Sequence, residues 1–143
     1  MAVIRDIMTK NVFAVRPETT LAEAVSVLTD HHVGGAPVIS ESGELLGVIS
    51  ELALLDVVFE EDARRAPVSL YMEEQVESVT PDEPLTRAAQ LFALYAFRRL
   101  PVVEGGKLVG IVSRRDLMNH ALRTNELLTE PLVELIPTLA INI

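Results

Sequence analysis

The sequence predicts an α+β fold made of two similar repeats, and three observations lead to this prediction. The chain matches itself at an offset of 64 residues and, after a turn that is one residue longer in the first copy, at an offset of 63. Each copy orders its segments as strand, helix, strand, strand, helix. One copy alone would leave an apolar sheet face uncovered, so we expect two pseudo-twofold-related β-α-β-β-α repeats packed through their sheets. We place the repeats at 1–64 and 65–123, and a C-terminal tail at 124–143.

The composition is typical of a small globular protein and argues against several classes. The 143 residues include 12 basic and 21 acidic side chains, and this net charge of −9 argues against nucleic acid and anionic membranes as partners. We expect no signal peptide and no membrane span, because no apolar run reaches about 20 residues. Cysteine is absent, which excludes thiol catalysis and disulfides and favours a cytoplasmic protein.

A valine-rich strand and an amphipathic helix open each repeat. The strands are expected at Val12–Val15 and Val76–Val79, and each stops at a proline two residues later. Thr20 and Glu23 form a capping-box pattern at the first helix, whereas Pro84 suits the first turn of the second. Apolar residues recur in both helices at i, i+3, i+4 and i+7. They are Leu21, Ala24, Val25 and Leu28 in the first helix, and Leu85, Ala88, Ala89 and Phe92 in the second.

A hairpin and a second helix complete each repeat. The hairpin strands cover 36–39 and 45–49 in the first repeat, and 100–103 and 107–112 in the second. The pair Gly105-Gly106 suits a tight turn because glycine tolerates positive φ. Ser50 and Ser113 are the predicted N-caps of helices over 50–61 and 113–122.

The motifs around the two hairpins resemble those of the CBS-domain family, and the resemblance covers about residues 3–122. The first motif is Gly34-Gly35-Ala36-Pro37-Val38-Ile39 followed by Gly47-Val48-Ile49-Ser50. The second is Arg98-Arg99-Leu100-Pro101-Val102-Val103 followed by Gly110-Ile111-Val112-Ser113-Arg114-Arg115-Asp116-Leu117. The resemblance implies a stand-alone CBS pair (a Bateman module) that forms a homodimer. It also implies regulatory binding of AMP, ATP, ADP or S-adenosylmethionine in a cleft between the repeats, with no catalysis and no required cofactor.

The sharpest candidate for ligand binding is the pattern Ser113-x-x-Asp116. In the family this pattern holds the ribose, and a helix N-terminus also favours phosphate. The same two residues form a helix-capping arrangement, and both interpretations stay open. The first repeat has Ala53 where the second has Asp116, and alanine cannot accept a hydrogen bond from a ribose hydroxyl. We therefore expect one good nucleotide site in each chain.

Basic residues are concentrated in the second repeat. Residues 1–64 carry a net charge of −7, whereas residues 65–143 carry −2. The family pattern implies that Arg98, Arg99 and Arg115 contact phosphate, and the alternative is that they are solvated charges paired with glutamates. The family pattern also implies an adenine pocket, for which ordinary packing is the alternative. Its residues are Lys10, Val12, Val33 and Gly34.

Two hypotheses follow for the function. The first is a sensor that binds an adenosyl ligand and modulates an effector protein that the sequence does not identify. The second is a dimeric structural or protein-interaction module without a nucleotide ligand. We expect no enzyme and no metal site, because no nucleophile–base pair and no metal-ligand spacing occurs. The apolar tail either packs over its own module or contacts a partner.

Overall fold

The computed structural model describes residues 2–124, which fall into two compact units. The first-repeat unit comprises Val12–Val76 and Gly105–Leu108. Among the described residues, the second-repeat unit comprises residues 2–11, 77–104 and 109–124. The units therefore differ from the sequence repeats, because residues 2–11 pack with the second repeat, whereas residues 65–76 and 105–108 pack with the first. Both units mix helices with a two-stranded sheet, which is the α+β composition that the sequence predicts.

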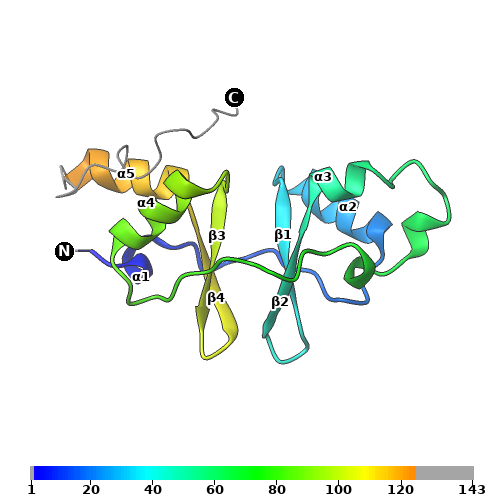
Figure 1. Ribbon diagram of the computed structural model, residues 1–143, viewed down its shortest axis with the longest axis horizontal. Helices are drawn as coiled ribbons and strands as arrows, with labels where there is room; N and C mark the ends of the chain where they lie inside the picture. The colour runs from blue at the N-terminus through cyan, green and yellow to red at the C-terminus, as the bar shows by residue number, and fades with distance from the viewer. Residues whose placement is uncertain (1, 125–143) are drawn as a thin grey trace. The chain divides into compact units, whose positions relative to one another are not determined.

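In the first-repeat unit, α2 (Leu21–Asp30) and α3 (Glu51–Leu55) lie beside the hairpin of β1 (Gly35–Ile39) and β2 (Leu45–Ser50) (Figure 1). The hairpin is antiparallel, and its register shifts between Val38 and Ile39. Two short 3₁₀-helices, Ala63–Arg65 and Val68–Leu70, follow. The buried core joins the apolar face of α2 to the sheet, as the helical periodicity predicts. Its members include Val15, Leu21, Ala24, Leu28, Val38, Ile49 and Val68.

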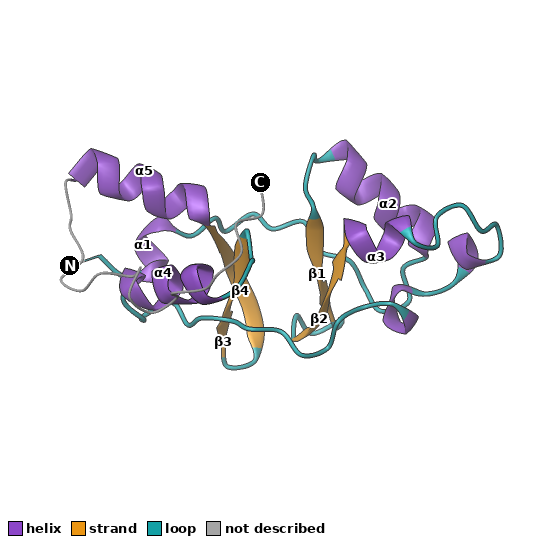
Figure 2. Ribbon diagram, turned by 45° about the horizontal axis from the view of Figure 1, so that its top comes forward, coloured by secondary structure: helices purple, strands orange, loops and turns teal. Residues whose placement is uncertain are grey.

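The second-repeat unit repeats this arrangement and adds a helix from the N-terminus. The β3–β4 hairpin (Arg99–Glu104 and Lys107–Ser113) lies beside α4 (Leu85–Leu94) and α5 (Arg114–Thr124), and α1 (Ile4–Ile7) packs with them (Figure 2). Gly105 and Gly106 have φ values of 60° and 80°, which confirms the predicted glycine turn. Ile4 has no exposed surface and belongs to this core. The other members include Val79, Leu85, Ala88, Leu91, Phe92, Leu100, Val102 and Val112.

Three predicted elements differ from the structure. The strands expected at 12–15 and 76–79 are reduced to single parallel bridges, Val15 to Val38 and Val79 to Val102. Pro17 and Pro81 explain this, because a residue without an N–H cannot extend the ladder. The helix expected over 50–61 ends at Leu55, since β-branched Val57 and Val58 and the acidic run at 60–62 oppose its continuation.

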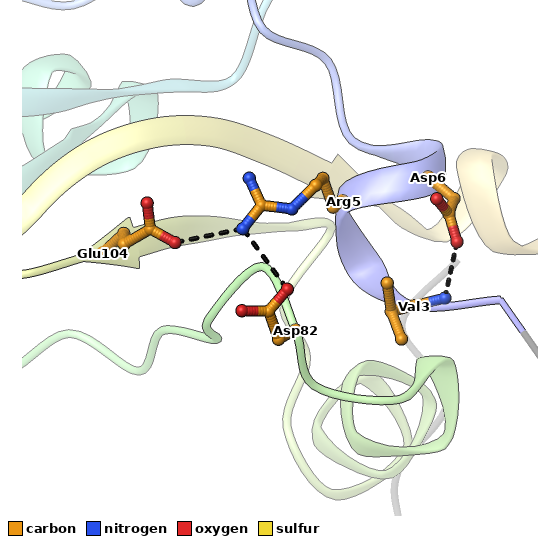
Figure 3. Close-up of polar contacts among 5 residues, drawn as sticks. All are labelled: Val3, Arg5, Asp6, Asp82 and Glu104. Atoms are coloured by element: carbon orange, nitrogen blue, oxygen red, sulfur yellow. Dashed lines mark hydrogen bonds and ion pairs between the residues drawn. The ribbon is translucent and has the colours of Figure 1, made fainter.

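The N-terminal segment is held in the second-repeat unit by backbone pairing and by charge. Thr9 and Ile111 exchange two backbone hydrogen bonds, at 2.8 and 2.9 Å. The Arg5 guanidinium forms ion pairs with the carboxylates of Glu104, at 3.1 Å, and Asp82, at 3.3 Å. These partners, Glu104 first, raise the pKa of Arg5. In the same segment the backbone N–H of Val3 donates to the Asp6 carboxylate (Figure 3). The first-repeat unit contains the matching contact, because Val48 and Glu73 exchange hydrogen bonds of 2.9 and 2.8 Å.

Candidate functional site

The candidate site starts at the junction of β4 and α5, where Ser113 and Asp116 cap the helix reciprocally. The Ser113 hydroxyl oxygen accepts from the Asp116 N–H at 3.1 Å, and the Asp116 carboxylate accepts from the Ser113 N–H at 2.8 Å. Both side chains are half-buried. The predicted capping role is thus confirmed. A carboxylate can accept about four hydrogen bonds, so this role leaves Asp116 with free acceptor capacity.

The first repeat has only half of this arrangement. The Ser50 hydroxyl oxygen accepts from the Ala53 N–H at 3.3 Å, which confirms Ser50 as the N-cap of α3. Ala53 has no side-chain oxygen to return the bond. The two helix starts therefore share one backbone geometry but differ in their capacity to accept hydrogen bonds from a ligand.

Basic side chains surround the start of α5. The Arg114 N–H donates to the Arg98 carbonyl at 3.2 Å, which brings the beginning of β3 beside the beginning of the helix. Arg98, Arg99, Arg114 and Arg115 are all exposed, and none of them forms an ion pair within residues 2–124. Their exposure fits the alternative that they are solvated charges, whereas the glutamate partners of that alternative do not occur within residues 2–124. Together with the α5 N-terminus they make this end of the second-repeat unit electropositive.

The residues proposed for adenine fall in both units. Lys10 is exposed in the second-repeat unit, one residue after Thr9, whose backbone pairs with β4. Val12, Val33 and Gly34 are half-buried in the first-repeat unit. The Gly34 carbonyl accepts from the Glu51 N–H at 2.9 Å, which matches the contact between Arg98 and Arg114.

A pocket of about 170 Å³ lies between α2 and α3 in the first-repeat unit. Val33 lines it, so the structure places this residue in an apolar recess on the helical side of its unit. The other lining residues are Val25, Leu28, Thr29, Glu51, Leu54, Leu55 and Val58.

The structure contains one aromatic contact near Val12 that the sequence did not predict. The Phe13 and His31 rings stack with centroids 3.5 Å apart and an interplanar angle of 14°. Phe13 is 49% exposed, and His32 next to the stack has a φ of 52°. The sequence shows the two histidines at the end of the helix, but no pattern in it indicates that Phe13 returns to meet them.

The described part of the chain lacks two kinds of feature. Residues 2–124 contain no helix that is long and apolar enough to cross a membrane. The same residues contain no group of three or more histidines and carboxylates placed to hold a metal ion. The apolar tail, for which two roles were open, lies outside the described residues.

Comparison with known proteins identifies the family. The model of the CBS domain matches twice, at residues 4–60 and 68–123. CBS domain-containing protein YhcV from Bacillus subtilis is 39% identical over 119 residues, which is 82% of this chain and 84% of that protein. An uncharacterized 17.7 kDa protein from Acidianus ambivalens is 36% identical over 120 residues, 83% of this chain and 73% of its own length.

Solved structures agree with this assignment. CBSX2 in complex with AMP is 32% identical, with a TM-score of 0.80 over 88% of this chain and 100% of that one, and another structure gives the source of CBSX2 as Arabidopsis thaliana. The relatives also include an A-adding tRNA nucleotidyltransferase from Aquifex aeolicus, 31% identical, of which this chain spans only 14%. The two matches to the domain model, and relatives that align over most of their length, show that the chain belongs to the CBS-domain family and carries a CBS pair.

Proposed function

We propose that this chain is a regulatory module that binds an adenosyl ligand at the start of α5. The observation that carries the proposal is the Ser113–Asp116 turn, which combines a helix N-terminus, a hydroxyl and a carboxylate with spare acceptor capacity. The ribose hydroxyls donate to Asp116. The phosphate lies against the N-terminus of α5, with Arg98, Arg99 and Arg115 as counter-charges. The AMP complex of CBSX2, which is 32% identical to this chain, supports the ligand class.

The inequality of the two helix starts supports one such site in each chain. Ser50 caps α3 as Ser113 caps α5, but Ala53 offers no acceptor for a ribose. In place of Arg98 and Arg99 the first repeat has Gly34 and Gly35, so it lacks the counter-charges as well.

Isothermal titration calorimetry with AMP, ADP, ATP and S-adenosylmethionine tests the proposal. We expect at least one ligand to bind with a stoichiometry of one per chain. Asp116→Ala removes the acceptor of the ribose hydroxyls, and we expect about 1–3 kcal/mol weaker binding, roughly five- to 150-fold. No heat with any of the four ligands at millimolar concentration would overturn the nucleotide function.

A matched control separates the loss of the cap from the loss of the site. Ser50→Ala and Ser113→Ala remove equivalent caps, and each destabilises its helix by about 1 kcal/mol. Only Ser113→Ala is expected to weaken ligand binding as well. Equal affinities in the two variants would contradict the assignment of the site to α5.

The second candidate function is a dimeric interaction module without a nucleotide ligand. Ser113 and Asp116 favour it in one respect, because they satisfy each other as a helix cap and so have a complete structural role without a ligand. A dimer whose thermal unfolding is unaffected by all four ligands would support this function over the first.

A further inference from the structure

The pocket between α2 and α3 forms a recess that combines an apolar lining with two polar side chains. Its volume is about 170 Å³, and all of its lining residues belong to the first-repeat unit. Leu28 and Leu54 come from the buried core of that unit, and Thr29 and Glu51 are the polar members. The remaining lining residues are Val25, Val33, Leu55 and Val58. A site of this composition suits a small ligand with an apolar body and one polar group.

The volume of the recess limits the size of the apolar body. An engineered apolar cavity of roughly 150 Å³ binds benzene, so the recess is large enough for one aromatic ring or a branched alkyl group of similar size. An adenosyl group has two fused rings and a ribose and is much larger than benzene. The ligand of the recess is therefore a different, smaller molecule.

The charge around the recess favours a cation. Residues 17–63, which include every lining residue, contain ten acidic side chains and no lysine or arginine. Glu51 is exposed, and it forms no ion pair within residues 2–124. An ammonium group beside it can donate a charge-assisted hydrogen bond to the carboxylate, whereas an anionic ligand is repelled.

The second repeat has different side chains at the equivalent positions. Arg114 stands at the position of Glu51, so the charge there is reversed. Phe92 and Phe97 stand at the positions of Leu28 and Val33 and occupy more space. We therefore expect a cationic ligand to bind to the first repeat alone.

We propose that the recess binds a small primary ammonium ion that carries an aryl or branched alkyl group. The apolar group packs on Leu28 and Leu54. The ammonium group donates to the Glu51 carboxylate and to the Thr29 hydroxyl oxygen. The site does not depend on nucleotide binding, because it lies in the first-repeat unit, whereas the start of α5 belongs to the second.

Titration of the full-length chain with benzylamine, followed by the methyl chemical shifts in NMR spectra, tests the proposal. Benzyl alcohol and benzoate are its neutral and anionic analogues of nearly the same shape. We expect benzylamine to shift the methyl signals of Val25, Leu54 and Val58, and to leave those of the second-repeat unit unchanged. Its affinity should be at least about threefold higher than that of benzyl alcohol, and benzoate should bind most weakly. High salt should narrow these differences.

Two variants and a control separate the effect of charge from that of shape. Glu51→Gln keeps the shape of the recess and removes its charge, so we expect benzylamine to bind about as weakly as benzyl alcohol. Thr29→Phe adds a ring beside the recess from an exposed position on α2, and we expect both ligands to lose their binding. Glu41→Gln removes an exposed charge on the turn between β1 and β2, and we expect the Kd of benzylamine to stay unchanged.

Several results would overturn the proposal. One is that benzylamine at millimolar concentration shifts none of these methyl signals, and another is that Glu51→Gln keeps the preference for benzylamine over benzyl alcohol. Displacement of benzylamine by AMP would assign the recess to the adenosyl ligand instead. Nuclear Overhauser contacts from Val25 and Val58 to a second copy, or to residues 125–143, would show that another occupant fills the recess.

Discussion

Alanine at Gly47 and at Gly110 tests how closely a chain segment approaches each hairpin. A Cβ atom at Gly47 would lie 2.6 Å from the Glu73 carbonyl oxygen and 3.1 Å from the Met72 sulfur. At Gly110 the nearest atom would be the Met8 sulfur at 2.8 Å, with the Thr9 carbonyl oxygen at 3.0 Å. The nearest obstacle is thus a backbone atom at Gly47 and a side-chain sulfur at Gly110, where the backbone oxygen is farther away, at 3.0 Å instead of 2.6 Å.

Because the obstacles differ, we expect Gly47→Ala and Gly110→Ala to lower the free energy of unfolding by different amounts. The Glu73 carbonyl is held by its hydrogen bond from the Val48 N–H, so it cannot move away without loosening that pair. Overpacking costs about 1–3 kcal/mol, and a weakened hydrogen bond adds about 1 kcal/mol. We therefore expect Gly47→Ala to lower the free energy of unfolding by about 2–4 kcal/mol. For Gly110→Ala we expect about 1–2 kcal/mol, because the Met8 side chain can change rotamer.

Urea unfolding followed by far-UV circular dichroism measures both values, and a second substitution sharpens the comparison. Met8→Ala removes the nearest obstacle at Gly110, so Gly110→Ala should cost much less in the Met8→Ala background than in the wild-type chain, and the cost of Met8→Ala itself is measured separately because Met8 packs on the second core. Met72→Ala leaves the Glu73 carbonyl in place, so the matching double variant of Gly47→Ala should recover little. Equal costs at the two glycines, or equal rescue by the two methionine substitutions, would refute this reasoning.

Three further predictions concern stability. Ile4→Ala should destabilise the second-repeat unit by about 2–5 kcal/mol in urea unfolding, because its side chain is fully buried in that core. Ser50→Ala and Ser113→Ala should each cost about 1 kcal/mol by the same measurement, and a loss at only one serine would contradict the shared capping geometry. Arg5→Gln should lower the thermal unfolding midpoint only slightly, and less at high salt than at low salt, because its partners Asp82 and Glu104 are exposed.

The repeats, hairpins and helix caps could be predicted from the sequence because their causes are local. The period of the apolar residues places Leu21, Ala24 and Leu28 on one buried face, and the glycine pair at 105–106 adopts the positive φ that its turn needs. The resemblance to the CBS-domain family, which rests on paired motifs at one spacing, is confirmed by two matches to the domain model.

Local patterns could not predict that the segment before the first helix of each repeat contacts the hairpin of the other repeat. An offset of 64 residues relates Met8 to Met72, but the structure docks Met8 on Gly110 and Met72 on Gly47. Neither the period of the apolar residues nor a capping motif indicates which hairpin a distant segment will contact. The same limit explains why α1 and its buried Ile4 were not predicted, because a single turn of helix is too short to show a period.

The candidate site was predicted only in its local part. Ser113 and Asp116 are three residues apart on one turn, so their hydrogen bonds follow from helix geometry. The exposure of Arg98 and Arg99 depends on what packs around the start of β3. That is a tertiary property, and the sequence carries no signal for it.

Equivalent positions in the two repeats are of two kinds. At some of them the backbone geometry restricts the type of residue, and at others it does not. Gly47 and Gly110 stay identical because a Cβ would collide with a docked segment, and Ser50 and Ser113 stay identical because each caps a helix. The two repeats differ in residue type at positions where the backbone geometry does not restrict it. Arginines replace Glu51 and Glu60 on exposed surface, and Asp116 replaces an alanine beside a cap that forms without it. The proposed function rests on one of these differences, because only the second repeat has a carboxylate three residues after its capping serine.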